Sequence, residues 1–273
     1  MNKKRSLVLG TEVFSGDWGN IFSEKMIEKI LVCFYENNFN ELDTAPSYGK
    51  NSLVEKLIGK IIKKKKFKIS SKFKIDNKEK LTPKIIVNNV KNQLDMSLKN
   101  LNIDCLETYY FHSEDNKLFF IDEIWHYLNL RKEQGDIKHL GLSMKHQLVV
   151  DDDLKQIYHA KEYGISIVQT VLNIYNKHSL NKLIPFCDKN KIDVYGRMPL
   201  AKGLLSGKYN SEKTFSNKDP RKNNEFTKKI IKFRLENKNL NLEKVIKWPL
   251  KNTKKIIFSV KNTQQLKQIL NFF

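Results

Sequence analysis

Four side chains whose types suit proton transfer stand at or just beyond the ends of predicted strands. Asp43, Lys72 and His112 each end such a strand, and Tyr48 follows Asp43 in a strand-to-helix loop. A neighbouring ammonium stabilises a phenolate, so we expect Lys72 to lower the pKa of Tyr48. A carboxylate can hold that ammonium where water is scarce, and an imidazole can donate a hydrogen bond to a carbonyl oxygen. The set indicates general acid catalysis on a carbonyl group.

Each of these residues alone also has an ordinary explanation. Asp43 can cap a turn, Lys72 can be the solvated end of a strand, and His112 can be satisfied by a hydrogen bond to Asp115. Their occurrence together, at successive strand ends, favours a functional site over these separate roles.

Predicted strands alternate with amphipathic helices along the whole chain. This alternation is typical of a parallel sheet with crossover helices. An open doubly wound sheet usually has a glycine-rich turn after its first strand, and the turn that begins at Gly10 lacks that pattern. We therefore predict an α/β fold, a single (β/α)8 TIM barrel domain over residues 1–273. Its active site would lie at the C-terminal face, where strand ends converge on one mouth.

Local signals place the boundaries of the elements. Ser52 and Glu55 have the spacing of a capping box, and Thr82-Pro83 is typical of a helix start. Three aspartates, 151–153, open a helix whose dipole favours negative charge, and a long polar loop covers 207–225. The predicted strands are residues 6–10, 40–43, 67–72, 106–112, 137–143, 167–170, 192–197 and 256–259.

The order Asp, Tyr, Lys, His at these strand ends resembles the aldo-keto reductases. Asp43, Tyr48, Lys72 and His112 match the catalytic tetrad of that family one for one, and the resemblance runs through most of the chain. It implies an NAD(P)H-dependent carbonyl reductase in which Tyr48 is the acid and NADPH gives the hydride.

Further segments resemble the cofactor side of the family. The strand with Gln169, the loop 199–209 and the segment 259–262 match its sixth, seventh and eighth strand ends. Departures from the family pattern are Met144, Arg197, Ser259 and Ile269. The resemblance implies NADP as cofactor, with NAD as the alternative, and backbone N–H groups around Gly203 to Gly207 that face the pyrophosphate. The implied cofactor-binding residues are Ser143, Gln169, Arg197, Leu200, Gly203, Ser206, Lys208, Ser259 and Lys261.

The implied substrate is a small aldehyde or ketone, with a sugar derivative among the candidates. Phe14, Trp18, Phe111 and the loop 207–225 are candidate walls of the substrate pocket, and ordinary core packing is the alternative for each. A second hypothesis is a cofactor-sensing regulatory or binding subunit with little turnover, which the departures at the cofactor side motivate.

The charge of the chain suggests a polyanionic partner at first sight. The 273 residues carry a net charge of +20, as many nucleic-acid-binding proteins do. Arginine, which nucleic-acid sites favour, is rare among the 50 basic residues. The arginines are Arg5, Arg131, Arg197, Arg221 and Arg234. We therefore expect no nucleic-acid partner, although the charge can draw anionic substrates toward a mouth.

The cysteines and the apolar runs indicate in which cellular compartment the protein is expected. Cys33, Cys105 and Cys187 are widely spaced in mostly apolar settings, which predicts buried thiols in a reducing compartment and no disulfide or metal site. The apolar run 7–9 is too short for a signal peptide, and no run approaches a membrane span. We expect a cytoplasmic protein with no membrane partner, and the sequence does not predict its oligomeric state.

Overall fold

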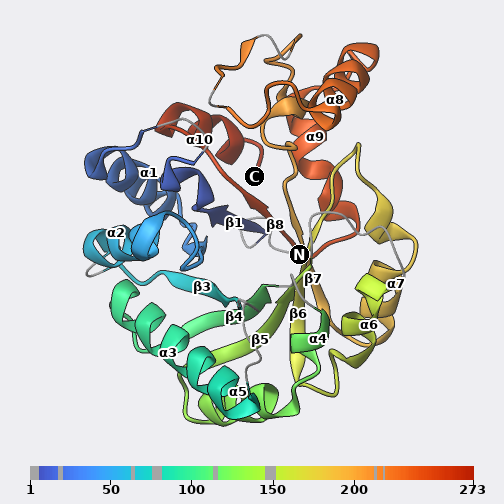
Figure 1. Ribbon diagram of the computed structural model, residues 1–273. Coiled ribbons are helices and arrows are strands. Elements are labelled where there is room, and N and C mark those ends of the chain that lie inside the picture. Colours follow the sequence, from blue (N-terminus) through green and yellow to red (C-terminus); the bar gives the residue numbers. More distant parts are fainter. Residues whose placement is uncertain are drawn as a thin grey trace.

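Parallel strands close into a barrel in the computed structural model, as Figure 1 shows. The structure describes residues 6–17, 21–62, 65–75, 82–112, 116–144, 152–211, 214–217 and 219–273. The strands follow one another in chain order, and β8 pairs with β1. They are β1 Leu7–Gly10, β2 Glu41–Asp43, β3 Lys68–Phe73, β4 Leu106–His112, β5 Ile137–Ser143, β6 Ile165–Val171, β7 Asp193–Arg197 and β8 Lys255–Phe258. The predicted (β/α)8 barrel is confirmed.

Helices surround the barrel (Figure 1). They are α1 Glu24–Glu36, α2 Leu53–Ile62, α3 Pro83–Leu101, α4 Asn116–Phe119, α5 Asp122–Glu133, α6 Asp152–His159, α7 Leu183–Lys189, α8 Glu225–Glu236, α9 Leu242–Lys247 and α10 Thr263–Leu270. Short 3₁₀ helices include Glu12–Ser15, Lys50–Ser52 and Leu204–Ser206. Two helices, α8 and α9, follow the predicted polar loop and form a small apolar cluster of their own with the Leu204–Ser206 turn.

The start of α3 follows the sequence signal. The Thr82 hydroxyl accepts a hydrogen bond from the Ile85 N–H at 3.4 Å, and Pro83 is the first helical residue. The buried face of α3 consists of Ile86, Val90, Leu94, Ser97 and Leu101. Residues three or four apart share one side of a helix, so this face covers the sheet.

The predicted capping box at the start of α2 is wrong. Ser52 lies in the 3₁₀ turn Lys50–Ser52 with a φ of +56°, which is not the extended conformation of a capping residue. Glu55 is fully buried, and its carboxylate accepts hydrogen bonds from Ser71 at 2.7 Å and from Asn100 at 3.4 Å. Glu55 therefore ties α2 to β3 and α3.

Side chains alternate between the inside and the outside of the barrel. Val8, Tyr110, Ile167, Tyr195 and Ile257 form a separate buried cluster of residues from five strands, which is the filled interior of a packed barrel. Their neighbours on the same strands face the helices.

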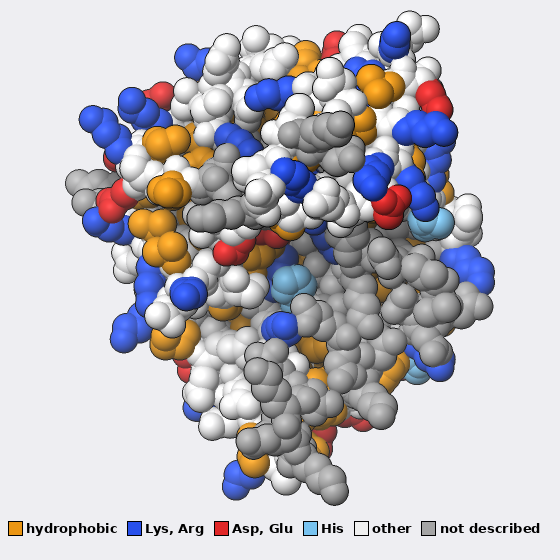
Figure 2. Space-filling model, turned by 45° about the horizontal axis from the view of Figure 1, so that its top comes forward, with side chains coloured by type: hydrophobic (Ala, Val, Ile, Leu, Met, Phe, Trp, Pro, Cys, Tyr) orange, Lys and Arg blue, Asp and Glu red, His pale blue; other side chains and the backbone are white. Residues whose placement is uncertain are grey.

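The surface charge, the cysteines and the helices can be compared with the sequence analysis, and one of the three cysteines differs from it. Lysine and arginine side chains are spread over the face that Figure 2 shows. Cys33 and Cys187 are buried free thiols as predicted, whereas Cys105 is partly exposed. Within the described residues, no helix combines the length and the apolar composition needed to cross a membrane. The cytoplasmic location stays a prediction.

Gly141 makes room for the Tyr110 ring inside the barrel, which its replacement by alanine should test. A Cβ at position 141 would lie 2.3 Å from Tyr110 Cδ1 and 2.4 Å from Cε1. Overpacking a core costs about 1–3 kcal/mol, and we expect Gly141→Ala to lower the free energy of unfolding by that amount in urea denaturation. Gly196→Ala on β7 is the matched control, because its Cβ would meet no atom closer than 3.4 Å. Equal stability of the two variants would contradict this account.

Candidate active site

The Lys72 ammonium is the centre of the predicted tetrad. Its Nζ donates to Asp43 Oδ1 at 2.6 Å, to the Thr44 carbonyl at 2.8 Å and to the Tyr48 hydroxyl at 3.1 Å. An ammonium has three donors, so each finds one acceptor. The Lys72 side chain is only 3% exposed, and three of the four predicted catalytic residues are thus in direct contact.

The ends of β1 and β2 fix the position of Asp43. Gly10 and Asp43 are register partners, and both the N–H and the hydroxyl of Thr11 donate to the Asp43 carbonyl at 3.0 Å. The loop that follows is closed by the Tyr48 N–H, which donates to the Ala45 carbonyl at 3.1 Å. These backbone bonds hold the Tyr48 phenol beside Lys72.

The pKa of Tyr48 differs from the sequence expectation. Burial raises the pKa of Tyr48 to about 12, and the Lys72 ammonium offsets only part of this increase. The expected net lowering is therefore wrong, because desolvation of the phenolate outweighs its attraction to the ammonium. Tyr48 is protonated at neutral pH. Since its oxygen accepts from Lys72, its own proton remains available for another acceptor.

The charge on Lys72 is secured by its partners. Burial alone would lower the pKa of Lys72, but the charges of Asp43 and Tyr48 and their hydrogen bonds raise it above the ordinary value. Lys72 therefore keeps its positive charge at neutral pH.

His112 ends β4, opposite Ser143 on β5. Burial, with the nearby charges of Lys72 and Arg197, lowers the pKa of His112 to about 3. The imidazole is neutral at physiological pH and offers one N–H donor and one acceptor. The alternative hydrogen bond to Asp115 lies outside the described residues.

Gln169 joins the tetrad from the opposite side of the barrel. Its Nε2 donates to Asp43 Oδ2 at 2.6 Å, and its backbone carbonyl accepts from the Met144 N–H at 2.9 Å. The Gln169 Oε1 atom is buried and has no hydrogen-bond partner among the described residues. An unsatisfied buried acceptor is costly, so the amide has capacity for a further donor.

Arg197 ends β7 and reaches the end of β5. Its Nη2 donates to the Met144 carbonyl at 2.6 Å, while its buried Nε has no hydrogen-bond partner in the part of the chain that the structure describes. Burial lowers the pKa of Arg197, with Tyr48, Glu12 and Asp43 opposing that effect. The free Nε and the free Gln169 Oε1 together offer one donor and one acceptor, which fits a carboxamide such as that of nicotinamide.

Basic side chains gather beyond β7 and β8. Burial lowers the pKa of Lys261, and the charges of Arg221 and Lys208 lower it further, while the charge of Asp219 opposes them. Arg221 is 7% exposed, and Asp219 holds it through a forked ion pair of 2.9 and 2.5 Å. Such a cluster fits phosphate groups. Sequence analysis missed Arg221, although an arginine in so lysine-rich a chain was an available signal.

The loop after β7 does not use its amides as the resemblance implied. Gly203 and Gly207 have φ angles of +86° and +83°, which favour glycine. The N–H groups of Leu204, Leu205 and Ser206 donate to carbonyls inside the loop. The expectation that the amides of this turn face a pyrophosphate is thus wrong for these three.

The remaining predicted cofactor residues lie at the same end of the barrel. The Ser259 hydroxyl donates to the Gly10 carbonyl at 2.8 Å and links the ends of β8 and β1. Ser143 is buried at the end of β5. The Leu200 carbonyl accepts from Leu205, and the Ser206 hydroxyl donates to the Gly203 carbonyl at 2.7 Å.

Two of the predicted aromatic pocket walls, Phe111 and Phe14, are core residues in the structure. Phe111 is 2% exposed and contacts Phe73, Phe119 and Trp125 on the helix side of β4. Strand alternation explains this placement, because Tyr110 faces inward. Phe14 is also buried, against Phe22. Trp18 lies outside the described residues.

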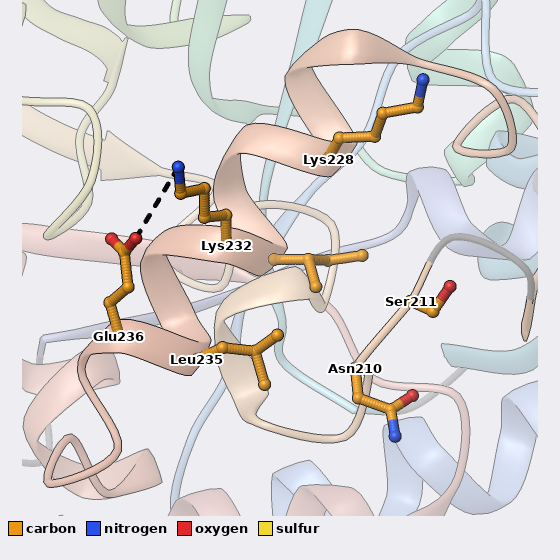
Figure 3. A pocket seen from close by; sticks show the side chains of 7 residues that line it. Asn210, Ser211, Lys228, Lys232, Leu235 and Glu236 are labelled. Atoms are coloured by element: carbon orange, nitrogen blue, oxygen red, sulfur yellow. Dashed lines mark ion pairs between the residues drawn. The ribbon is translucent and has the colours of Figure 1, made fainter.

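A surface pocket of about 480 Å³ lies beside α8, and Figure 3 shows the side chains that line it. It shares no lining residue with the tetrad or with Gln169 and Arg197. Its lining residues are Asn210, Ser211, Lys228, Ile231, Lys232, Leu235 and Glu236. Lys228 pairs with Glu225, and Lys232 pairs with Glu236, so its charges are already balanced.

The buried pair of Asp43 and Lys72 should be strongly coupled in stability. Removing one partner of a buried ion pair costs about 3–5 kcal/mol because the other charge stays buried. We expect Asp43→Asn and Lys72→Met each to lower the free energy of unfolding by that amount, and the double variant to lose less than their sum. The exposed pair Glu24 and Lys60 is the control, where truncation should cost about 0–1 kcal/mol. Additive losses at the buried pair would refute the coupling.

The depressed pKa of His112 predicts a contribution to acid denaturation. The folded-state pKa, about 3, lies below the ordinary value of 6.5. The native state therefore binds fewer protons than the unfolded chain between these values, and its stability is lost as the pH falls from 6.5 toward 3. We expect His112→Gln to reduce the loss of unfolding free energy between about pH 6.5 and 4.5 by about 2 kcal/mol. His126→Gln, the same substitution at an exposed position, is the control for the change of side chain.

Comparison with known proteins places this barrel in a family. Residues 6–273 match the model of the Aldo/keto reductase family. An aldo-keto reductase from Schizosaccharomyces pombe, whose name includes NADP(+), is 30% identical over 220 residues, covering 75% of this chain and 59% of that relative. The NADH-specific methylglyoxal reductase of Escherichia coli is 27% identical over 219 residues, covering 73% of this chain and 64% of that relative. The chain thus spans about three fifths of the length of these relatives.

Solved structures share the fold at lower identity. A glycerol dehydrogenase from Gluconobacter oxydans superposes with a TM-score of 0.78 at 21% identity, over 98% of this chain and 86% of the other. The holo form of an aldo-keto reductase from Bacillus halodurans gives a TM-score of 0.77 at 19% identity, over the same shares. Because the family match runs from the first described residue to the last, this chain belongs to the aldo/keto reductase family of oxidoreductases.

Proposed function

We propose that this protein reduces an aldehyde or a ketone with a hydride from NADPH and a proton from Tyr48. The observation that carries the proposal is the triple contact of the buried Lys72 ammonium with Asp43, the Thr44 carbonyl and the Tyr48 hydroxyl. The phenol oxygen accepts from Lys72, so its own proton remains available for a further acceptor. Membership of the aldo/keto reductase family supports the same reaction.

The tetrad performs the proton half of the reaction. The neutral His112 imidazole donates its N–H to the carbonyl oxygen and orients it. Nicotinamide, when bound, supplies the hydride to the carbonyl carbon. As negative charge develops on the oxygen, Tyr48 transfers its proton, and Lys72 stabilises the phenolate that remains. With a pKa of about 12, the phenol is a stronger acid than water, whose pKa is about 15.7, and transfer to an alkoxide is downhill.

Side chains around the mouth support a nicotinamide cofactor. Gln169 and Arg197 would hold the carboxamide through their unpaired buried atoms, beside Ser143. Lys208 and Lys261 would take the phosphates beside Arg221, whose charge is paired with Asp219, and the two lysines favour NADPH, with its additional 2′-phosphate, over NADH. The names of the relatives include both NADP(+) and NADH, so NADH is the alternative cofactor.

The tetrad geometry argues against a regulatory subunit without turnover. All three contacts of Lys72 are within 3.1 Å, as a working acid requires. The family relatives named for methylglyoxal reduction and glycerol oxidation act on small oxygenated carbon compounds. By analogy we assign a small carbonyl compound to this chain, with a sugar derivative as one candidate.

Replacement of Tyr48 by phenylalanine tests the proposal. The variant keeps the ring and loses the acid, so kcat for aldehyde reduction should fall by about 10²- to 10⁴-fold, measured as NADPH oxidation. NADPH affinity, measured by fluorescence titration, should stay within a factor of two or so, since the phenol is not among the phosphate ligands. Tyr158→Phe, at an exposed position on α6, is the matched control and should retain full activity. Undiminished turnover in Tyr48→Phe would exclude Tyr48 as the acid.

A further inference from the structure

The strand that carries Lys72 extends beyond one of its two neighbours. The ladder between β2 and β3 ends at Ser70, whereas the ladder between β3 and β4 continues to Phe73. Among the described strands, the backbone of residues 71–73 is therefore paired on its β4 side only. Lys72 lies in this stretch, while all three acceptors of its ammonium belong to β2 and the loop beyond it. The ladder that joins these two strands thus stops before it reaches the lysine.

Glu55 on α2 holds the residue that precedes Lys72. Ser71 faces the helices outside the barrel, because side chains alternate along a strand, and its hydroxyl donates to the Glu55 carboxylate at 2.7 Å. Both side chains are fully buried. The Asn100 amide on α3 donates to the other oxygen of Glu55 at 3.4 Å. The carboxylate is thus held between α3 and β3, and it fixes Ser71.

Close packing of α2 on α3 brings Glu55 to this position. The two helices contact each other outside β3 (Figure 1). A Cβ at Gly59, about one turn beyond Glu55, would lie 2.1 Å from the Asn100 carbonyl oxygen. Because glycine has no Cβ, the helices can approach closely enough for the carboxylate to reach both of its donors.

Gln93 on α3 holds the residue that follows β3. Its side-chain amide pairs with both main-chain groups of Lys74: Oε1 accepts from the N–H at 3.1 Å, and Nε2 donates to the carbonyl at 2.8 Å. The amide thus provides two hydrogen bonds of the kind that a neighbouring strand would provide. Lys72 lies between Ser71 and Lys74, so the chain on either side of the lysine is bound to a helix outside the barrel.

We propose that Glu55 and Gln93 are positioning residues of the catalytic site, which keep the Lys72 ammonium on its acceptors by fixing the strand residues on either side of it. The inference rests on the proposed reductase function. Both residues act through the chain next to Lys72 and are assigned no contact with the substrate. A displacement of about 1 Å in a catalytic site can lower a rate by about 100-fold, so the loss of either contact should slow proton transfer from Tyr48.

The test measures kcat for aldehyde reduction per NADPH-binding site in the full chain. Binding sites are counted by fluorescence titration, so unfolded molecules do not enter the rate. In Glu55→Ala and in Gln93→Ala, kcat per site should fall about tenfold to a hundredfold, while the Kd for NADPH stays within about a factor of two. Glu55→Gln should retain most of the activity, because its amide oxygen still accepts from Ser71 and the Asn100 amide can turn its oxygen toward the new NH₂ group.

Leu128→Ala on α5 is the control for a loss of stability alone. Leu128 is fully buried, so its truncation leaves a cavity and should lower the urea midpoint of unfolding. The substitution removes neither the Glu55 contact nor the Gln93 contact. The kcat per NADPH-binding site of this variant should therefore equal that of the unaltered protein.

The possible results separate this inference from the proposed function. Unchanged kcat per site in both alanine variants would overturn the inference and leave the reductase assignment intact. Equal losses in Glu55→Ala and Glu55→Gln would overturn the positioning role of Glu55, because its charge and not its contact with Ser71 would then matter. If Glu55→Ala yields no folded protein, Gln93→Ala decides the question, since Gln93 is only partly buried. Absence of turnover by the unaltered protein with every aldehyde would overturn the proposed function and the inference together.

Discussion

A positive charge buried at the end of β3 is the constraint on which the site depends. Moving an ammonium out of water costs several kcal/mol unless partners offset the loss. Asp43, the Thr44 carbonyl and the Tyr48 hydroxyl offset it for Lys72, and all three come from β2 and the loop beyond it. The position of that loop is thus tied to one nitrogen, and the loop conformation and the proton donor are secured by the same contacts.

Closure of the barrel brings together side chains from strands that are distant in the chain. Gln169 on β6 reaches Asp43 on β2 across the mouth at 2.6 Å, although 126 residues separate them in the chain. Thr11 holds the backbone of the same aspartate from β1, and Ser259 binds the end of β1 from β8. Since these contacts span distant segments, the site is complete only when all of these strand ends have met.

Sequence reasoning predicted the framework better than the environment of its residues. Alternating strands and helices define the barrel, and strand ends place Asp43 and Lys72 at its mouth, because both follow from local patterns. The pKa of Tyr48 could not be predicted, since desolvation depends on neighbours from the whole fold. Glu55 has capping spacing but is buried, and spacing alone does not reveal burial. The outward side of Phe111 could have been predicted from strand alternation beside an inward-facing neighbour.

Asp43 divides its two oxygens between different tasks. Oδ1 accepts from Lys72, and Oδ2 accepts from the amide of Gln169. A single carboxylate thus stands between the residue that would hold the hydride donor and the residue that releases the proton. A change in electron density at the Gln169 amide changes the negative charge on Asp43. That change alters how strongly Asp43 stabilises the Lys72 ammonium, and hence how strongly Lys72 acts on the Tyr48 phenol. Under the proposed mechanism, the residue that would hold the hydride donor and the residue that releases the proton are therefore linked through the Asp43 carboxylate and the Lys72 ammonium.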